Sequence, residues 1–146
     1  MRVAVGADDA APLVDALIEE LRRRGADVEC YGVQAGQPAQ WASIGRAVGE
    51  AVARSEADVG IVCCWTGTGI SIAANKVPGA RAALCGDPVT AQGARTWNDA
   101  NVLALSLRNT SVPLGLEILD AFLRTPPSDA PDDLVEIGKL EGTIPA

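Results

Sequence analysis

Histidine is absent from this 146-residue sequence, and aromatic residues are scarce: three tryptophans, one tyrosine and one phenylalanine. Without histidine the chain lacks the commonest protein metal ligand and the commonest general base near neutral pH. Any chemistry must use cysteine, aspartate, glutamate, threonine, asparagine, arginine or backbone groups. We therefore expect no metal site.

Long basic runs and long apolar runs are also missing. The net charge is −7, and the longest run of cations is Arg22-Arg23-Arg24. Neutralising nucleic-acid phosphates needs a basic face, so the sequence predicts no nucleic-acid partner. No stretch of 18 apolar residues occurs, and Met1-Arg2 leads into a short apolar run unlike the apolar core of a signal peptide. These absences predict a cytoplasmic protein without a membrane partner.

The four cysteines are Cys30, Cys63, Cys64 and Cys85. Two are adjacent, a spacing that suits neither a disulfide framework nor a zinc knuckle, so we expect reduced thiols. Strand alternation predicts that Cys63 and Cys64 point to opposite faces of a sheet. We interpret Cys63, Cys30 and Cys85 as small core residues.

A single domain over residues 1–146 is expected, because the length allows one continuous core but not two ordinary ones. Short β-type runs alternate with helical stretches. The predicted strands are residues 3–6, 28–31, 59–63, 81–84 and 101–105, and the predicted helices are 13–24, 44–55, 70–76, 88–96 and 113–124. This spacing predicts a doubly wound, Rossmann-like α/β fold with a five-stranded parallel sheet and helices on both faces.

The divergent tail, residues 125–146, begins Thr-Pro-Pro-Ser-Asp-Ala-Pro and has room for one short helix near residues 132–140. In doubly wound sheets the ligand lies beyond the carboxyl ends of the strands. That rule predicts three segments near one cleft: Asp8-Asp9, residues 64–69 and Cys85-Gly86-Asp87.

Residues 61–71 (IVCCWTGTGIS) combine a buried strand, a glycine-punctuated turn and a helix start. Gly67 and Gly69 let backbone N–H groups converge at the helix N-terminus, which favours a phosphate, a carboxylate or a developing oxyanion. A tight turn that needs glycine for a positive φ explains the pattern equally well. Cys64 stands where the strand opens into the turn, near a helix dipole that favours a thiolate able to abstract a proton. An ordinary core role is the alternative for Cys64.

Two strings, residues 67–85 (GTGISIAANKVPGARAALC) and 98–105 (NDANVLAL), closely resemble the ribose-5-phosphate isomerase B and galactose-6-phosphate isomerase family. With Gly6-Ala7-Asp8 they extend the resemblance over most of residues 1 to 124. The resemblance implies a homodimer or homotetramer with active sites between subunits. It also implies aldose–ketose isomerisation of a small-molecule substrate through a cis-enediolate, a reaction that needs no cofactor.

The same resemblance implies roles for individual residues. In the family a cysteine at the position of Cys64 takes the proton beside the carbonyl, with a threonine at the position of Thr66 nearby. Backbone N–H groups stabilise the enediolate oxygen and come from the glycine loop, here Gly67, Thr68, Gly69 and Ser71. Three further residues match positions that contact substrate: Asp8, Asn98 and Arg108.

The chain departs from the family pattern at three places. Asp9 and Trp97 each stand where the family has histidine, so Asp8 or Asp9 is expected to handle the proton. Two C-terminal arginines that hold the substrate phosphate in the family are missing, since no cation occurs between Arg124 and Lys139. An acidic run repels a phosphate dianion, so phosphorylated sugars are poor candidates.

All three tryptophans, Trp41, Trp65 and Trp97, fall on family positions that face or border the cleft. They indicate either a cleft for an apolar or aromatic ligand or the filling of a decayed site. Three functions follow. The first is an isomerase for a non-phosphorylated or unusual polyhydroxy substrate, the second a tautomerase, lyase or cyclase acting on an apolar or aromatic carbonyl compound. The third is a catalytically silent paralogue that binds a ligand or completes a hetero-oligomer. The sequence favours the isomerase.

Overall fold

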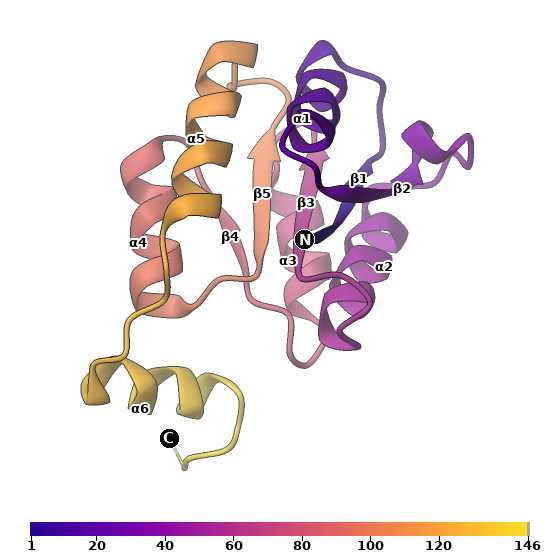
Figure 1. Cartoon of the computed structure of the whole chain (residues 1–146). Helices are drawn as coiled ribbons and strands as arrows, with labels where there is room; N and C mark the ends of the chain where they lie inside the picture. The colour runs from indigo at the N-terminus through magenta and orange to yellow at the C-terminus, as the bar shows by residue number, and fades with distance from the viewer. Residues whose placement is uncertain (146) are drawn as a thin grey trace.

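The strands form one parallel sheet between two layers of helices (Figure 1). The computed structural model describes residues 1–145. The strands are β1 (Arg2–Ala7), β2 (Asp27–Gly32), β3 (Val59–Cys64), β4 (Ala82–Leu84) and β5 (Val102–Ser106). The helices are α1 (Pro12–Arg23), α2 (Trp41–Ala53), α3 (Thr68–Asn75), α4 (Pro88–Asn98), α5 (Val112–Arg124) and α6 (Pro131–Leu140), and a 3-10 turn, η1 (Val33–Ala35), follows β2. The predicted five-stranded doubly wound α/β fold is confirmed.

The sheet order is β2-β1-β3-β5-β4, so the chain winds in one direction from β1 and in the other from β3. All neighbouring strands in it are parallel. In register, Ala7 lies beside Cys63, and Cys64 lies beside Ser106. The carboxyl ends of β1, β3 and β5 therefore meet at one edge of the sheet. The topological switch point, where such sheets bind ligands, lies there between β1 and β3.

Helical periodicity and strand alternation divide the core between the two faces of the sheet. Helix α1 is amphipathic and buries one apolar stripe, made of Leu13, Val14, Leu17, Ile18 and Leu21. Buried residues of α1, α4 and α5 form one core, and those of α2 and α3 form the other. Cys63 belongs to the first core and Cys64 to the second, as strand alternation predicts.

Helix α2 begins three residues before the predicted start at residue 44. Gln40 is extended, and its carbonyl accepts hydrogen bonds from the N–H groups of Ser43 at 3.0 Å and Ile44 at 3.2 Å. The predicted start coincides with the first buried residue, Ile44, whereas the first helical turn is exposed. As a result Trp41 is the first residue of a helix instead of part of a loop.

Helix α4 runs to Asn98, beyond the predicted end at residue 96. It closes on Asp99, which is left-handed with φ 42° and ψ 46°. Trp97 thus lies in the last turn of a helix. Within the described residues, no helix combines the length and the apolar character needed to cross a membrane.

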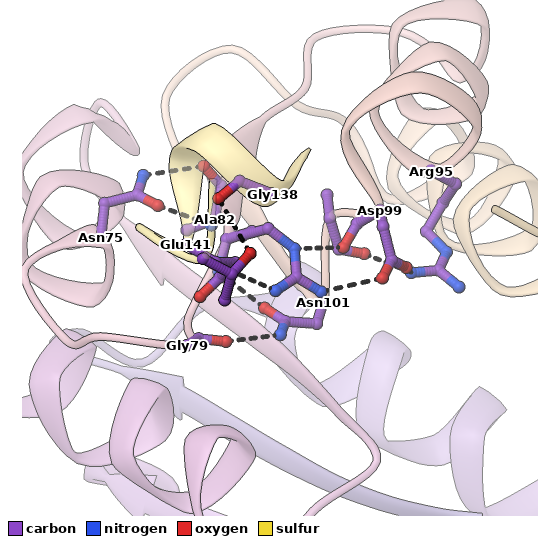
Figure 2. A network of polar contacts seen from close by, with 11 residues as sticks. Asn75, Gly79, Ala82, Arg95, Asp99, Asn101, Gly138 and Glu141 are labelled. Atoms are coloured by element: carbon purple, nitrogen blue, oxygen red, sulfur yellow. Dashed lines mark hydrogen bonds and ion pairs between the residues drawn. The ribbon is translucent and has the colours of Figure 1, made fainter. Parts of the chain in front are cut away.

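The C-terminal helix α6 matches the predicted short helix and lies beyond the amino ends of the strands, away from their arrowheads (Figure 1). Gly138 is the residue of α6 that is buried. An ion pair joins the end of this helix to the main body, with Arg81 Nη1 2.6 Å from Glu141 Oε1 (Figure 2). The linker is attached as well, since the Ser128 N–H donates to the Thr96 carbonyl at 2.8 Å.

Candidate active site

A hollow of about 280 Å³ lies at the carboxyl edge of the sheet, at the switch point. The turn after β1, the start of α2, and the end of β3 with the turn that follows form its walls. Its lining residues are Asp8, Trp41, Cys64, Trp65, Thr66, Thr68 and Gly69. All of them are site residues that the sequence predicts, so chain folding brings this subset together from three separate segments.

Cys64 is the last residue of β3 and lies at the boundary between the core and the hollow. It is 5% exposed and belongs to the α2–α3 core, yet it also lines the hollow. Its carbonyl accepts hydrogen bonds from the N–H groups of Gly67 at 3.1 Å and Leu107 at 3.0 Å. Two backbone hydrogen bonds therefore fix the point where the strand opens into the turn.

The turn after Cys64 depends on Gly67, which has φ 76° and caps the N-terminus of α3. A Cβ at this position would lie 2.5 Å from Leu84 Cδ1 and 2.9 Å from the carbonyl carbon of Leu105. Both the dihedral angle and the lack of space therefore require glycine. Here the expected use of glycine for a positive φ is confirmed.

The start of α3 supplies the polar part of the hollow. The first N–H groups of an α-helix have no acceptor within the helix, and in α3 they belong to Thr68, Gly69 and Ile70. The positive end of the helix dipole lies at the same place. The hydroxyl oxygens of Thr66 and Thr68 are 2.7 Å apart, a hydrogen bond in which either group can donate.

Gly69 serves a different purpose from Gly67. It lies within α3, and a Cβ there would be 3.0 Å from Cδ2 and Cε3 of the Trp41 indole. The absence of a side chain at Gly69 thus lets the indole pack against the first turn of α3. Trp41 is 42% exposed and Trp65 is 65% exposed, so both indoles keep a face open beside the hollow.

The two aspartates after β1 differ in their surroundings. Asp8 lines the hollow and is half-buried; burial raises the pKa of its carboxyl, its own backbone N–H opposes that rise, and the charge of Asp9 adds to it. Asp9 is exposed, does not line the hollow, and accepts a hydrogen bond from the Ala10 N–H at 2.9 Å. Of the two, Asp8 is the carboxyl group that lines the hollow.

Two further predicted residues lie near the hollow without lining it. Arg108 is exposed at the same edge of the sheet, and its N–H donates to the Trp65 carbonyl at 2.9 Å. Ser71 is 8% exposed, and its N–H donates to the Gly67 carbonyl at 3.2 Å. Ser71 thus stabilises the turn through this backbone hydrogen bond.

The sequence reasoning missed Ser106, which holds the turn in place. It ends β5 beside Cys64 in register, is 7% exposed, and its hydroxyl donates to the Trp65 carbonyl at 3.0 Å. The same oxygen accepts the Asn109 N–H at 3.2 Å. One sequence signal was present: a single hydroxyl residue closes the apolar run of β5.

Trp97 and Asn98 lie at the amino ends of the strands, whereas the hollow lies at the carboxyl ends. They end α4 and precede β5, whose five residues span roughly 16 Å. Asn98 lines another cavity, of about 620 Å³, together with Arg81 and Glu141. Within one chain, therefore, the structure brings two of the three tryptophans to the hollow and leaves Trp97 apart.

The segment Cys85-Gly86-Asp87 was expected at the same cleft, and the structure corrects this. Strand β4 is an edge strand, separated from β3 by β5. Cys85 is 1% exposed in the α1–α4–α5 core, where burial raises its pKa to about 11. Asp87 instead caps α4, accepting hydrogen bonds from the Thr90 N–H at 2.8 Å and the Thr90 hydroxyl at 2.6 Å.

Of the other thiols, Cys63 lies inside the core and Cys30 packs against its margin. Cys63 is fully buried, burial raises its pKa to about 12, and its predicted core role is confirmed. Cys30 was expected in the core as well, but it is half-buried, because β2 forms the other edge of the sheet. In residues 1–145 no cluster of three or more cysteine, aspartate or glutamate side chains is arranged to hold a metal ion.

Comparison with known proteins assigns the family. The ribose/galactose isomerase family model matches residues 3–136. The chain belongs to this family. Its enzyme class is therefore that of an isomerase, as the sequence predicted.

Three similar proteins show how far the similarity extends. Ribose-5-phosphate isomerase B of Escherichia coli is 38% identical over 123 residues, which cover 84% of this chain and 83% of that protein. The DNA damage-repair/toleration protein DRT102 of Arabidopsis thaliana is 43% identical over 129 residues, 86% of this chain but 40% of the plant protein. The structure of Clostridium thermocellum ribose-5-phosphate isomerase B aligns with a TM-score of 0.91 at 37% identity, covering 98% of this chain and 97% of that one.

Proposed function

We propose that this member of the ribose/galactose isomerase family is an aldose–ketose isomerase in which Cys64 moves a proton between adjacent carbons of a polyhydroxy carbonyl substrate. The observation that carries the proposal is that Cys64 and the first residues of α3 line the same hollow. A base and a set of oxyanion-stabilising N–H groups then face one bound substrate. The comparisons give no support to a tautomerase, lyase or cyclase, or to a silent paralogue.

In the aldose-to-ketose direction, the Cys64 thiolate takes the proton from C2. The electrons of the broken C–H bond form the C1=C2 double bond, and the carbonyl oxygen O1 takes up the negative charge. The N–H groups of Thr68 and Gly69 at the start of α3 stabilise that charge. The proton on the Cys64 sulfur then returns to C1, and loss of the O2 proton completes the C2 carbonyl.

The proton on O2 must also reach O1, and Asp8 is the group we assign to this transfer. The raised pKa lets its carboxyl keep a proton to a higher pH than an ordinary aspartate. Neutral Asp8 donates to O1, then takes the proton from O2 and returns to its starting state. The hydroxyl pair of Thr66 and Thr68 lines the same hollow and can hydrogen-bond to either oxygen.

We propose further that the preferred substrate carries no phosphate. The lining of the hollow contains one carboxyl group and two indoles, and no lysine or arginine. A phosphate dianion gains no ion pair from such a lining, while indole faces offer contact area to the carbon skeleton of a sugar. Relatives such as ribose-5-phosphate isomerase B of Escherichia coli are named for phosphorylated sugars, so this proposal departs from the substrate class that their names support.

A second copy of the chain is proposed to complete the hollow. Apolar side chains are exposed on the edge strand β4 and its two flanking helices: Ile72, Leu84, Val89 and Trp97. A two-fold axis beside β4 would place the amino ends of the strands of one copy next to the carboxyl ends of the other. Each copy would then bring the last residues of α4, Trp97 and Asn98 (the Trp97–Asn98 turn), to the hollow of the other. The prediction is a dimer in sedimentation velocity, weakened by Trp97→Glu; a wild-type monomer would overturn it.

The reaction and the substrate are tested together with pairs of sugars that differ by one phosphate. The purified chain is assayed with D-ribose and D-ribose 5-phosphate, and with tetrose and hexose pairs, by following aldose–ketose conversion. We expect kcat/KM to be at least about tenfold higher for a neutral sugar than for its phosphate, because the phosphate gives up hydration and gains no ion pair in the hollow.

The possible outcomes separate the two proposals. A higher kcat/KM for the phosphorylated member of every pair would overturn the substrate class and leave the reaction standing. Conversion of none of the sugars would overturn the reaction itself.

A further inference from the structure

Arg81 lies just before β4, at the amino ends of the strands and so opposite the hollow. Its whole guanidinium group is engaged by Asp99 and Glu141, both labelled in Figure 2. Nε donates to the Asp99 carbonyl at 2.8 Å, and Nη2 is 2.9 Å from Asp99 Oδ2. Nη1 is 2.6 Å from Glu141 Oε1. The Arg81 side chain is 18% exposed, so solvent screens these contacts less than those of an ordinary surface ion pair.

Asp99, the first partner, directly follows Trp97 and Asn98. Its left-handed backbone carries an energetic cost for any residue other than glycine, although aspartate tolerates it better than most. Arg81 offsets that cost by holding both the side chain and the carbonyl of Asp99. Arg95 adds a third contact, with Nη1 3.2 Å from Asp99 Oδ1. The turn that carries Trp97 and Asn98 therefore depends on arginine contacts.

Glu141, the second partner, is the C-cap of α6. This helix buries little of its own surface, and Leu134, Val135 and Leu140 are exposed at 51%, 40% and 68%. The contact with Arg81 is therefore one of few that hold α6 to the body, beside the buried Gly138 and the Ser128–Thr96 hydrogen bond. The cavity of about 620 Å³ next to this helix is lined by Arg81, by Glu141 and by Asn98, which precedes Asp99.

From these contacts we infer that Arg81 is a positioning residue that fixes the Trp97–Asn98 turn and helix α6 relative to each other. The consequence for catalysis rests on the proposed function, in which a second copy presents this turn to the hollow. Arg81 then affects substrate affinity without touching substrate, because it holds the turn that reaches the hollow of the other copy. Cys64 and Asp8 lie at the carboxyl ends of the strands, away from Arg81, and are not disturbed by its loss.

Hydrogen exchange measured by mass spectrometry tests the coupling of the two segments directly. Arg81→Lys keeps the charge but loses the planar fork of donors. It should reduce protection about tenfold in both residues 95–101 and residues 131–141, as expected for the loss of one charged hydrogen bond. Glu141→Gln should affect residues 131–141 alone, and Asp99→Asn should affect residues 95–101 alone.

Kinetics provide the readout that a purely structural role would not give. With whichever sugar is turned over, Arg81→Lys should raise KM about tenfold and leave kcat within about threefold, because a displaced Trp97–Asn98 turn weakens binding of substrate and transition state alike. Glu141→Gln should give a smaller rise in KM.

The inference is overturned if Arg81→Lys changes exchange in one segment alone or uniformly over the chain, or if it lowers kcat with KM unchanged. Should Arg81→Lys fail to fold, the other two variants decide: Asp99→Asn with unchanged exchange in residues 95–101 and unchanged KM would overturn it. If no sugar is turned over, the proposed function fails, while the exchange pattern still decides whether Arg81 couples the two segments.

Discussion

Gly67 and Gly69 lie two residues apart in one turn and are glycine for different physical reasons. Gly67 needs the left-handed backbone, and the sequence pattern was sufficient to predict this. Gly69 makes room for the indole of Trp41, which lies 28 positions earlier in the chain. No local pattern reveals that contact, because it arises when α2 packs against α3. Adjacent residues are a simpler case: strand alternation alone predicted that Cys63 and Cys64 face different cores.

Alanine substitutions distinguish these two glycines. Gly67→Ala should lower the free energy of unfolding by about 2–4 kcal/mol. The alanine would have to keep a positive φ, and its Cβ would lie too close to the Leu105 backbone. Gly69→Ala gains about 1 kcal/mol of helix propensity, offset by displacement of the Trp41 ring, so its stability should change by less than about 1 kcal/mol. Urea unfolding gives both values. A larger loss for Gly69→Ala than for Gly67→Ala would contradict this account.

Asp8 predicts a specific pH dependence of activity. In the proposed mechanism its carboxyl must be protonated to donate to O1, and its raised pKa keeps it protonated above the ordinary value of 3.8. Activity should therefore fall as pH rises through the raised pKa. Asp8→Asn should remove this limb of the pH–kcat profile and lower kcat by about 10²–10⁴-fold. Asp9→Asn should move the limb to lower pH, since the charge of Asp9 helps to raise the pKa of Asp8. A wild-type limb that survives in Asp8→Asn would refute the assignment.

Cys63 predicts how stability changes at alkaline pH. Its thiol titrates at about 12 in the folded chain, against an ordinary 9.0, because burial disfavours the thiolate. Above pH 9.0 the unfolded chain loses this proton first, so Cys63 alone should lower stability by about 1.4 kcal/mol per pH unit up to about pH 12, and Cys85 should add to this fall up to about pH 11. Cys63→Ala should flatten that part of the curve relative to wild type. Equal slopes for the two proteins in denaturant titrations would show that Cys63 is not responsible.

At the scale of elements, helix starts were predictable where the sequence contains a capping residue. Helix α4 begins at Pro88 as predicted, because Asp87 and Pro88 suit the N-cap and first-turn positions. Helix α2 has no side-chain cap at Gln40, and its predicted start was three residues late. All five strands were predicted, since buried parallel strands are short apolar runs, and no strand end differed from its prediction by more than one residue.

The cap of α4 gives a prediction at this scale. Asp87→Ala should destabilise the protein by about 1 kcal/mol, because it leaves the Thr90 N–H without its 2.8 Å acceptor. Ser111→Ala at the start of α5 is the matched control, and its longer capping bond of 3.4 Å predicts a smaller loss. Thermal unfolding of both variants provides the comparison, and an Asp87→Ala melting curve identical to wild type would exclude the capping role.

For the whole molecule, the sequence correctly predicted that Asp8 and residues 64–69 share one cleft, but wrongly placed Cys85-Gly86-Asp87 there as well. Sheet order decides which segments meet. Asp8 and Cys64 converge because β1 and β3 are neighbours, whereas Cys85 is excluded because β4 lies at the edge. Trp97 and Asn98 precede β5 and so occupy the other end of the sheet. These placements follow from long-range strand pairing, which local patterns in the sequence do not encode.

In the proposed mechanism the Cys64 sulfur exchanges a substrate proton inside the hollow, and solvent isotope incorporation measures this exchange most directly. The chain is incubated in deuterated water with the sugar it turns over, and deuterium at C1 and C2 is followed by NMR. We predict incorporation for wild type and for the core control Cys63→Ala, and loss of at least about 10²-fold in rate for Cys64→Ala. Incorporation at an undiminished rate in Cys64→Ala would contradict the account.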